Sequence, residues 1–296
     1  VPEAFSAGGP QAAVPPAPWT VASPAEAQPR GEWWLGFQDP ALAELVQRAG
    51  SANTSIQQAA GRLAEARSLL RSADAARSVQ VDASAGVTLQ AGAATTGSAT
   101  PATLGTAGLN VSYELDLFGK LSQTSDAARL DADARAALLQ STRLMVQADV
   151  AQTYLQLRAA QAELQLVNES LAAYQDTLRL TQRRQQAGDV AELDVARVQT
   201  EVAATESEAL ALQRQQALLA NALAVLVGEV PGSFALPAAA GDAALPIIPP
   251  GVPGTVLARR PDVSAAQAAV MAAQARVGVA QTAWFPAITL TGNAGH

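Results

Sequence analysis

Hydrophobic and polar residues recur with two different periods along this chain. Within 41–76 apolar residues are spaced three and four apart, at Ile56, Ala59, Leu63, Ala66, Leu70 and Ala73. This heptad spacing predicts a helix with one apolar seam, and Asp39-Pro40 is a favourable helix start. In 79–91 and again in 107–115 apolar and polar residues alternate. Period two is typical of strands with one apolar and one polar face, so these segments predict a β-hairpin.

The helical period then returns and lasts unusually long. Neither Pro nor Gly occurs between Lys120 and Ala187, so we expect one helix about 100 Å long. Gly188 and Asp189 interrupt it, and a second apolar seam follows over 192–227. The two helices therefore predict an antiparallel coiled-coil hairpin whose tip lies near 187–190.

The last part of the chain repeats the first. Val263, Ala266, Val270, Ala273, Val277 and Ala280 show the spacing of the seam that begins at Ile56, at a constant offset of 207 residues. The same offset places Val81 on Ile288, where a third alternating segment begins. We expect an internal two-fold repeat of which this chain holds only the beginning of the second copy.

These patterns divide the chain into seven segments. We expect a proline-rich extended strap (1–40), the helix of the first repeat (41–76), a transmembrane β-hairpin (77–117), a long periplasmic helical hairpin (118–228), an equatorial connector (229–253), the helix of the second repeat (254–283) and the start of a third strand (284–296).

Composition excludes several classes of function. The net charge of −7 argues against a nucleic-acid partner, which requires clustered cations. There is no cysteine, and the single histidine is His296, so disulfides, zinc sites and the common nucleophile–base pairs are excluded. The sequence predicts no catalytic residue, cofactor or metal site. It contains no run of about 18 apolar residues that would predict a transmembrane helix.

Two interpretations fit the strands, and two fit the helices. An isolated hairpin is stable neither in water nor in lipid. Strands of this length match the roughly 9–11 residues needed to cross a membrane at a tilt. In this interpretation the strands of several chains combine into one closed barrel. A soluble sheet with one wetted face gives the same alternation. The heptad seams likewise fit either a channel wall or an ordinary coiled coil.

Five motifs resemble the outer-membrane factors of tripartite efflux systems, the TolC/OprM-like channels, and among them the NodT-type lipoproteins. They are WWLGFQDPALAELV (33–46), YELDLFGK (113–120), QAGDVAELDVARVQTEVA (186–203), RRPDV (259–263) and AWFPAITLTG (283–292). The motifs occur in the family's order from about residue 30 onward. YELDLFGK and RRPDV together are fairly specific, whereas each alone is weak.

The resemblance implies a homotrimer whose strands form one β-barrel in outer-membrane lipid and whose helices form a periplasmic α-barrel. It implies a passive conduit rather than an enzyme, exporting drugs or other small toxic compounds. The expected partners are a periplasmic adaptor and an inner-membrane transporter. Lipoprotein members begin with a lipidated cysteine, which this sequence lacks. The alternatives are a periplasmic adaptor, which also carries a long helical hairpin, and a structural coiled-coil protein.

Two sets of residues are candidates for function. Gly188 and Asp189, at the hairpin tip, are expected either to dock the adaptor or to form a plain turn. Asp82, Glu114 and Asp116 are expected on the polar strand faces, where they would line the lumen and favour cations. A structural role is equally open for Asp116, which lies where strand gives way to helix.

The sequence also contains two pairs of adjacent aromatic residues. Trp33, Trp34, Trp284 and Phe285 are candidates for anchors at a membrane interface. Trp33 and Trp34 precede every strand, and we expect them to pack the strap onto the helices.

Overall fold

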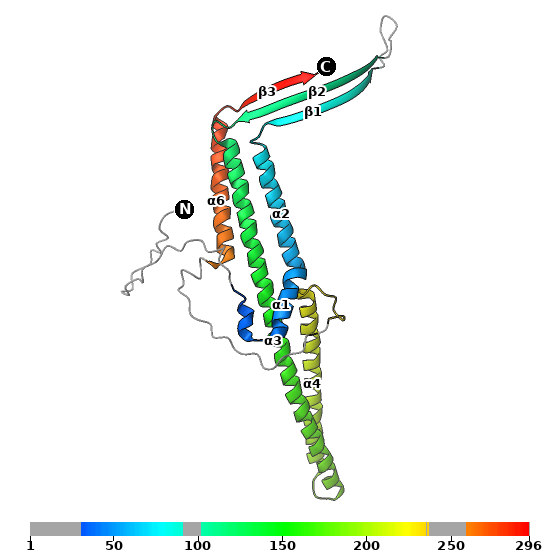
Figure 1. The fold of residues 1–296 in the computed structure, drawn as a ribbon. Coiled ribbons are helices and arrows are strands. Elements are labelled where there is room, and N and C mark those ends of the chain that lie inside the picture. The colour runs from blue at the N-terminus through cyan, green and yellow to red at the C-terminus, as the bar shows by residue number, and fades with distance from the viewer. Residues whose placement is uncertain (1–30, 91–101, 235, 237–258, 296) are drawn as a thin grey trace, which may run out of the picture.

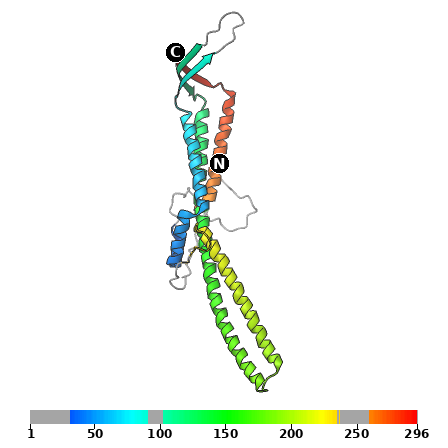
Figure 2. The same ribbon diagram turned by 90° about the vertical axis from the view of Figure 1, so that its right-hand side faces the viewer.

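A computed structural model describes residues 31–90, 102–234, 236 and 259–295. The chain is mostly helical with a small antiparallel sheet, and it is elongated (Figure 1). Three helices, α2 (Thr54–Ala75), α3 (Lys120–Gln186) and α6 (Pro261–Gln281), lie side by side below the sheet. At the opposite end α3 and α4 (Glu192–Leu226) form a long curved hairpin (Figure 2). Of the expected segments, residues 1–30, 91–101, 235, 237–258 and 296 lie outside the described residues.

The first predicted helix is in fact two helices, so the expectation of one helix over 41–76 was wrong. Helix α1 (Pro40–Ala52) is followed by α2, and Asn53 between them is extended (φ −65°, ψ 127°). The Asn53 side chain accepts hydrogen bonds from the backbone N–H groups of Ser55 and Ile56, which makes it the N-cap of α2. Asp39 caps α1 as expected, through the N–H groups of Ala41 and Leu42. A short 3-10 helix, η1 (Trp33–Phe37), precedes α1.

Helix α3 is the central helix of the molecule, because each of the other long helices packs against it. Its 67 residues are continuous, as the absence of Pro and Gly predicted. It ends in a Schellman motif: Gly188 (φ +84°) donates its N–H to Gln185, and Asp189 donates its N–H to Arg184. Helix α4 ends in the same way at Gly228 and Glu229.

The only extensive core of the described chain lies where α1, the middle of α3 and the end of α4 meet. We call this cluster the hub, and its largest fully buried members are Leu42, Leu45, Val46, Val150, Tyr154, Leu157, Leu223 and Val227. Polar contacts reinforce it. The Tyr154 hydroxyl donates to Asp39 Oδ2 at 2.6 Å, and Asn53 Nδ2 donates to the Leu226 carbonyl at 2.9 Å.

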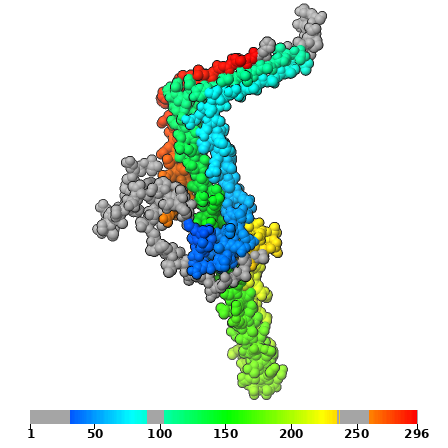
Figure 3. Space-filling model, viewed as in Figure 1, coloured from blue at the N-terminus to red at the C-terminus, as the bar shows by residue number. Residues whose placement is uncertain are grey.

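The sheet has the order β1-β2-β3 and is antiparallel throughout. Its strands are β1 (Gln80–Gln90), β2 (Ala102–Leu115) and β3 (Ile288–Gly295). The third strand begins at Ile288, where the repeat predicted it, and Thr282–Trp284 before it form a 3-10 turn, η2. Pro286 follows this turn and has no N–H to donate to a ladder. In Figure 3 the sheet projects from the helices as an uncovered arm.

The internal repeat appears in the element boundaries. Shifted by 207 residues, α2 and the start of β1 would fall on 261–282 and 287, and the structure has α6 at Pro261–Gln281 and β3 from Ile288. The packing of the two helices differs. The α2 seam at Ile56, Leu63 and Ala66 is buried, whereas its α6 counterparts Val263, Val270 and Ala273 are exposed. Because α3 lies between the two helices, each turns the opposite side toward it, and α6 packs through Ala265 and Ala272.

Candidate functional site

The sheet has two chemically different faces, and its register fixes which residues share each face. Val81 lies opposite Val111, Ala83 opposite Leu109, and Leu290 opposite Tyr113. The other face carries Asp82 opposite Asn110, Gln80 opposite Ser112, and Thr289 opposite Glu114. No strand residue whose side chain is described is buried; Val87 and Leu89 are 72% and 77% exposed. Within the described residues the sheet therefore presents an uncovered apolar face and an uncovered polar face.

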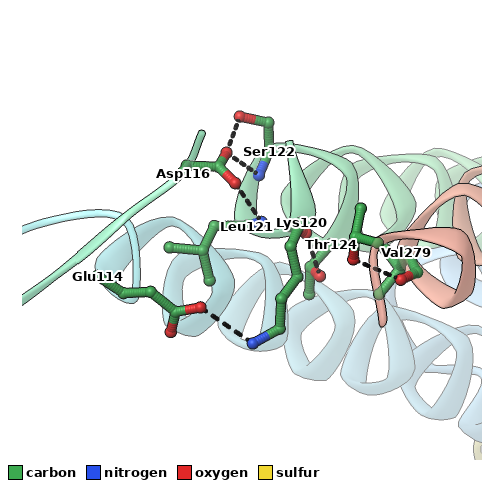
Figure 4. Close-up of polar contacts among 8 residues, drawn as sticks. Glu114, Asp116, Lys120, Leu121, Ser122, Thr124 and Val279 are labelled. Carbon is green, nitrogen blue, oxygen red and sulfur yellow. Dashed lines mark hydrogen bonds and ion pairs between the residues drawn. The ribbon is translucent and has the colours of Figure 1, made fainter. Parts of the chain in front are cut away.

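Asp82 and Glu114 lie on the polar face, as expected. Asp82 is exposed in β1. Glu114 is partly buried, and its carboxylate is 3.0 Å from Lys120 Nζ at the start of α3 (Figure 4). The negative charge of Glu114 is thus offset by a cation of its own chain, whereas Asp82 has no ion pair among the described residues.

Asp116 has the structural role that was the alternative to lining the lumen. Strand β2 ends at Leu115, and the Asp116 carboxylate turns toward the first turn of α3 (Figure 4). Asp116 Oδ1 accepts the N–H of Leu121 at 2.9 Å, and Oδ2 accepts the N–H of Ser122 at 2.8 Å and the Ser122 hydroxyl. The helix N-cap is Gly119, which has no side chain to accept these bonds. Asp116 therefore caps α3 and does not belong to the polar strand face.

Electrostatics agree with this capping role. Partial burial raises the pKa of the Asp116 carboxyl, but the hydrogen bonds from the Ser122 side chain and from the two backbone N–H groups, with the positive charge of Arg77, outweigh it. The net pKa is lowered, so the charged form that the helix N-terminus favours is stabilised.

Gly188 and Asp189 are at the tip of the hairpin and are exposed, as expected. Arg183 and Arg184 occupy the last turn of α3, and Glu192 and Asp194 the first turn of α4. Each pair complements the dipole of its own helix end. The Asp194 carboxylate accepts the N–H of Ala191 at 3.2 Å, so the tip is closed by its own turn chemistry.

Sequence patterns missed the contacts that hold the base of the hairpin. Gln216, a polar exception in the α4 seam, donates its side-chain N–H to the Ala160 carbonyl of α3 at 2.9 Å. Arg48 of α1 pairs with Glu229, just after α4, and its guanidinium lies 5.7 Å from the centre of the Phe234 ring. A polar residue within a heptad seam is the signal that identifies Gln216; nothing in the sequence pairs Arg48 with Glu229.

Other features of the described chain lie apart from these candidate residues. A groove of about 620 Å³ lies between α2, α3 and α6, lined by alanines and by charged residues such as Arg62, Asp131 and Arg276. Within the described residues no group of three or more His, Asp or Glu side chains could hold a metal ion. No described helix is both long enough and apolar enough to cross a membrane.

Comparison with known proteins identifies the family. A model of the outer membrane efflux protein family matches residues 45–229 and 252–296. Among similar proteins of Pseudomonas putida, the pyoverdine export outer membrane protein OpmQ is 35% identical over 94% of this chain and 61% of its own length. The toluene efflux pump outer membrane protein TtgF is 32% identical over 89% of this chain and 55% of its own. The chain thus spans little more than half the length of these relatives.

Solved structures show the same fold. The outer membrane protein VceC of Vibrio cholerae superposes with a TM-score of 0.75 at 30% identity, over 89% of this chain and 64% of VceC. The outer-membrane channel OprN gives a TM-score of 0.78 at 30% identity, over 93% of this chain and 64% of OprN. Both are outer-membrane proteins, which decides against a periplasmic adaptor and a structural coiled coil and confirms the expected family. The chain belongs to the outer membrane efflux protein family, a family of efflux proteins and not of enzymes.

Proposed function

We propose that this chain forms part of a passive export channel of the outer membrane, the conduit of a tripartite efflux pump. The observation that carries this proposal is the uncovered two-faced sheet at one end of a rod of helices. Apolar side chains that face lipid and polar side chains that face water are the requirement for a membrane-spanning barrel wall. An open sheet is excluded from lipid because its edge groups stay unpaired, so β1 and β3 need neighbours.

A homotrimer supplies those neighbours. The described part of the chain has three strands with free edges at β1 and β3, and cyclic symmetry closes such edges into a barrel without exposed ends. The exposed valine stripe of α6 supports an α-barrel by the same reasoning. Its counterpart in α2 is buried on α3, so we expect the stripe to be covered by a further helix that plays the role of α3 in the second repeat.

In this arrangement the sheet spans the lipid and the α3–α4 hairpin extends into the periplasm. We propose that Gly188 and Asp189 contact the periplasmic adaptor, which delivers cargo from an inner-membrane transporter. The exposed turn supports this, since it is the part of the chain farthest from the sheet (Figure 1). The cargo class we propose is small toxic compounds, because one relative is a toluene efflux protein and another exports pyoverdine. Lipid anchoring remains a prediction of the NodT-type resemblance.

Of the three acidic residues expected to line the lumen, Asp82 and Glu114 remain candidates. Both lie on the polar face, and we expect them to favour cations. Asp82→Asn should lower the cation preference of single channels more than Glu114→Gln, because Lys120 already offsets Glu114. Unchanged preference in the double variant would remove the lumen role.

The decisive experiment is cell fractionation followed by electrophoresis of unheated samples. A channel is recovered from the outer membrane as a trimer that dissociates on heating, and deletion of its gene raises sensitivity to exported compounds. Recovery as a water-soluble monomer would overturn the proposal. Adaptor docking is tested by cysteine crosslinking from Asp189, with Glu163 on the same hairpin as the matched control; crosslinks to the adaptor from both positions, or from neither, contradict docking at the tip.

A further inference from the structure

The groove between α2, α3 and α6 lies on the same side of the chain as the polar face of the sheet. A second hollow, of about 410 Å³, joins the two. It is lined by Gln80 and Glu114 of the polar face and by Ser72 and Ala76 of α2. Leu69, three residues before Ser72, lines the groove. Because residues three and four apart share one face of a helix, the polar face, the hollow and the groove form one continuous surface.

Helix α6 indicates that the groove stays open in an assembled channel. Ala272 packs on α3, and Val263 and Val270 are the exposed stripe that we expect a further helix to cover. The groove residues Asp262 and Ala269 each precede one of these valines by one position, which turns them about 100° away from the stripe. A helix on the stripe would therefore leave the groove uncovered.

The lining of the groove is part apolar and part charged. It consists of six alanines, two leucines, three arginines and three acidic residues. Two of the acidic residues are neutralised within the chain. Asp131 of α3 pairs with Arg276 of α6, and Asp262 pairs with Arg260 at 2.6 Å. Only the third, Glu65, forms no ion pair with a described residue.

Two of the three arginines are uncommitted. Arg62 of α2 and Arg135 of α3 are exposed and form no ion pair with any described residue. A guanidinium presents several N–H donors in a planar fork that matches the two oxygens of a carboxylate. With Glu65 as the only uncommitted acid, the charge that the groove offers to a ligand is net positive.

We propose that this groove binds small organic anions in transit through the channel. Arg62 and Arg135 would bind a carboxylate or sulfonate through charge-assisted hydrogen bonds, and the alanines and leucines would contact the apolar part of the same molecule. A volume of about 620 Å³ is in the range of small-molecule sites. This inference rests on the proposed function, because it needs the polar face and the groove to line the lumen.

Equilibrium binding of benzoate tests the site, with benzylammonium as a probe of similar size and opposite charge. Saturation-transfer NMR on the detergent-extracted trimer measures both dissociation constants. Benzoate should bind more tightly than benzylammonium, and Arg62→Gln combined with Arg135→Gln should weaken benzoate binding about tenfold. The matched control, Arg67→Gln combined with Arg143→Gln, removes the same charge from exposed arginines outside the groove and should leave the affinity unchanged.

A variant with the opposite expected sign guards against loss of binding through misfolding. Glu65→Gln removes the one uncommitted acid of the groove, so benzoate should bind about two- to threefold more tightly. Unchanged or weaker binding in this variant would contradict an electrostatic contact between the groove and the anion.

The position of the groove in the lumen is tested by a single thiol. Leu69→Cys introduces it into a sequence without cysteine, and a negatively charged thiosulfonate reagent should react with it and change the single-channel current. A thiol that does not react means that another surface covers the groove. Reaction without a change in current means that the groove lies outside the lumen. Either result overturns the inference.

The binding outcomes separate this inference from the function on which it rests. If the parent protein forms a conducting trimer but binds benzoate no better than benzylammonium, the channel stands and the anion site is wrong. Equal losses of affinity in the two double-arginine variants would also overturn the site, because overall charge alone would then attract benzoate. If the parent protein forms no trimer and conducts no current, the proposed function fails and the inference fails with it.

Discussion

The hub and the sheet are opposite solutions to the placement of apolar side chains. In the hub Leu42, Leu45 and Leu223 are fully buried, and each makes its contacts within one chain. In the sheet Val87 and Leu89 are largely exposed on a surface that no described element covers. The hub therefore contributes stability to the chain by itself, whereas the described part of the chain offers nothing that covers the sheet.

The two regions also treat polar groups differently. The polar side chains of the hub form hydrogen bonds within the chain. The Tyr154 hydroxyl donates to Asp39, and the Asn53 side chain donates to the Leu226 carbonyl. The sheet leaves the backbone groups of its outer edges without a partner among the described strands. Loss of a hub contact should act on folding, and loss of a sheet contact on membrane assembly. The four predictions that follow test this division, from the largest effect to the smallest.

The largest effect is expected in the hub. Leu157→Ala removes a side chain that is 2% exposed and leaves a cavity in the rod. We expect a loss of about 2–5 kcal/mol in the free energy of unfolding, measured by denaturant titration of the helical circular dichroism signal. The exposed Glu163 on the same helix provides the control, for which Glu163→Ala should change stability by less than about 0.5 kcal/mol. Equal effects of the two variants would show that the hub is not the stabilising core.

A charge introduced on the apolar face of the sheet should impair assembly of the protein in the membrane and leave the folding of the helices unchanged. Val87→Arg places a cation on the face that we assign to lipid, at a cost of about 2–4 kcal/mol per chain near the bilayer centre. We expect loss of the heat-modifiable trimer from the outer membrane while the helical signal persists. Thr88→Arg lies on the opposite face and should assemble. Were Thr88→Arg the more damaging change, the two faces would be assigned the wrong way round.

A smaller effect in the hub isolates its hydrogen bond from its packing. Tyr154→Phe keeps the ring and removes the hydroxyl that donates to Asp39. Since burial, with the bond to Asp39, raises the pKa of Tyr154, the hydroxyl stays protonated and able to donate at neutral pH. We expect a loss of about 1–2 kcal/mol and faster amide exchange in α1, with little change at the hairpin tip. Tyr174→Phe, on an exposed ring, is the control; similar losses from both variants would contradict a role for the bond.

Periodicity predicted the elements of this chain because each element is regular over many residues. A seam such as Ile56, Leu63 and Ala66 is repeated often enough to define a helix and its buried side. The strand faces followed from alternation alone, and the register has confirmed them. The break at Asn53 was missed although Asn is a favoured N-cap, because the seam continues across the two helices.

Tertiary placement could not be read from the same patterns. The seam of α6 was correctly located as an apolar stripe, but α3 packs on its other side, through Ala265 and Ala272. Leu144 fits the α3 heptad frame, yet Val146 and Val150 form the core at that level, because α3 is covered by neighbours from more than one direction. The bond between Asp39 and Tyr154 joins residues 115 apart, and no local spacing encodes it.

The smallest effect is expected at Asp116, where the sheet joins α3, and it depends on pH. The folded state lowers the pKa of Asp116, so its capping bonds add stability that is present above the ordinary pKa of an aspartate and is lost as the pH falls through the lowered value. Asp116→Asn keeps the size of the side chain and removes the charge that α3 favours. We expect about 1 kcal/mol lower stability at neutral pH, and a difference from the parent protein that shrinks below about pH 4. Denaturant titrations of both proteins across this range measure it. Asp126→Asn, one turn further along the exposed side of α3, controls for loss of charge alone. If the stability difference between Asp116→Asn and the parent protein did not depend on pH, the carboxylate would not cap the helix in its charged form. The sheet would then be joined to the helices by packing alone.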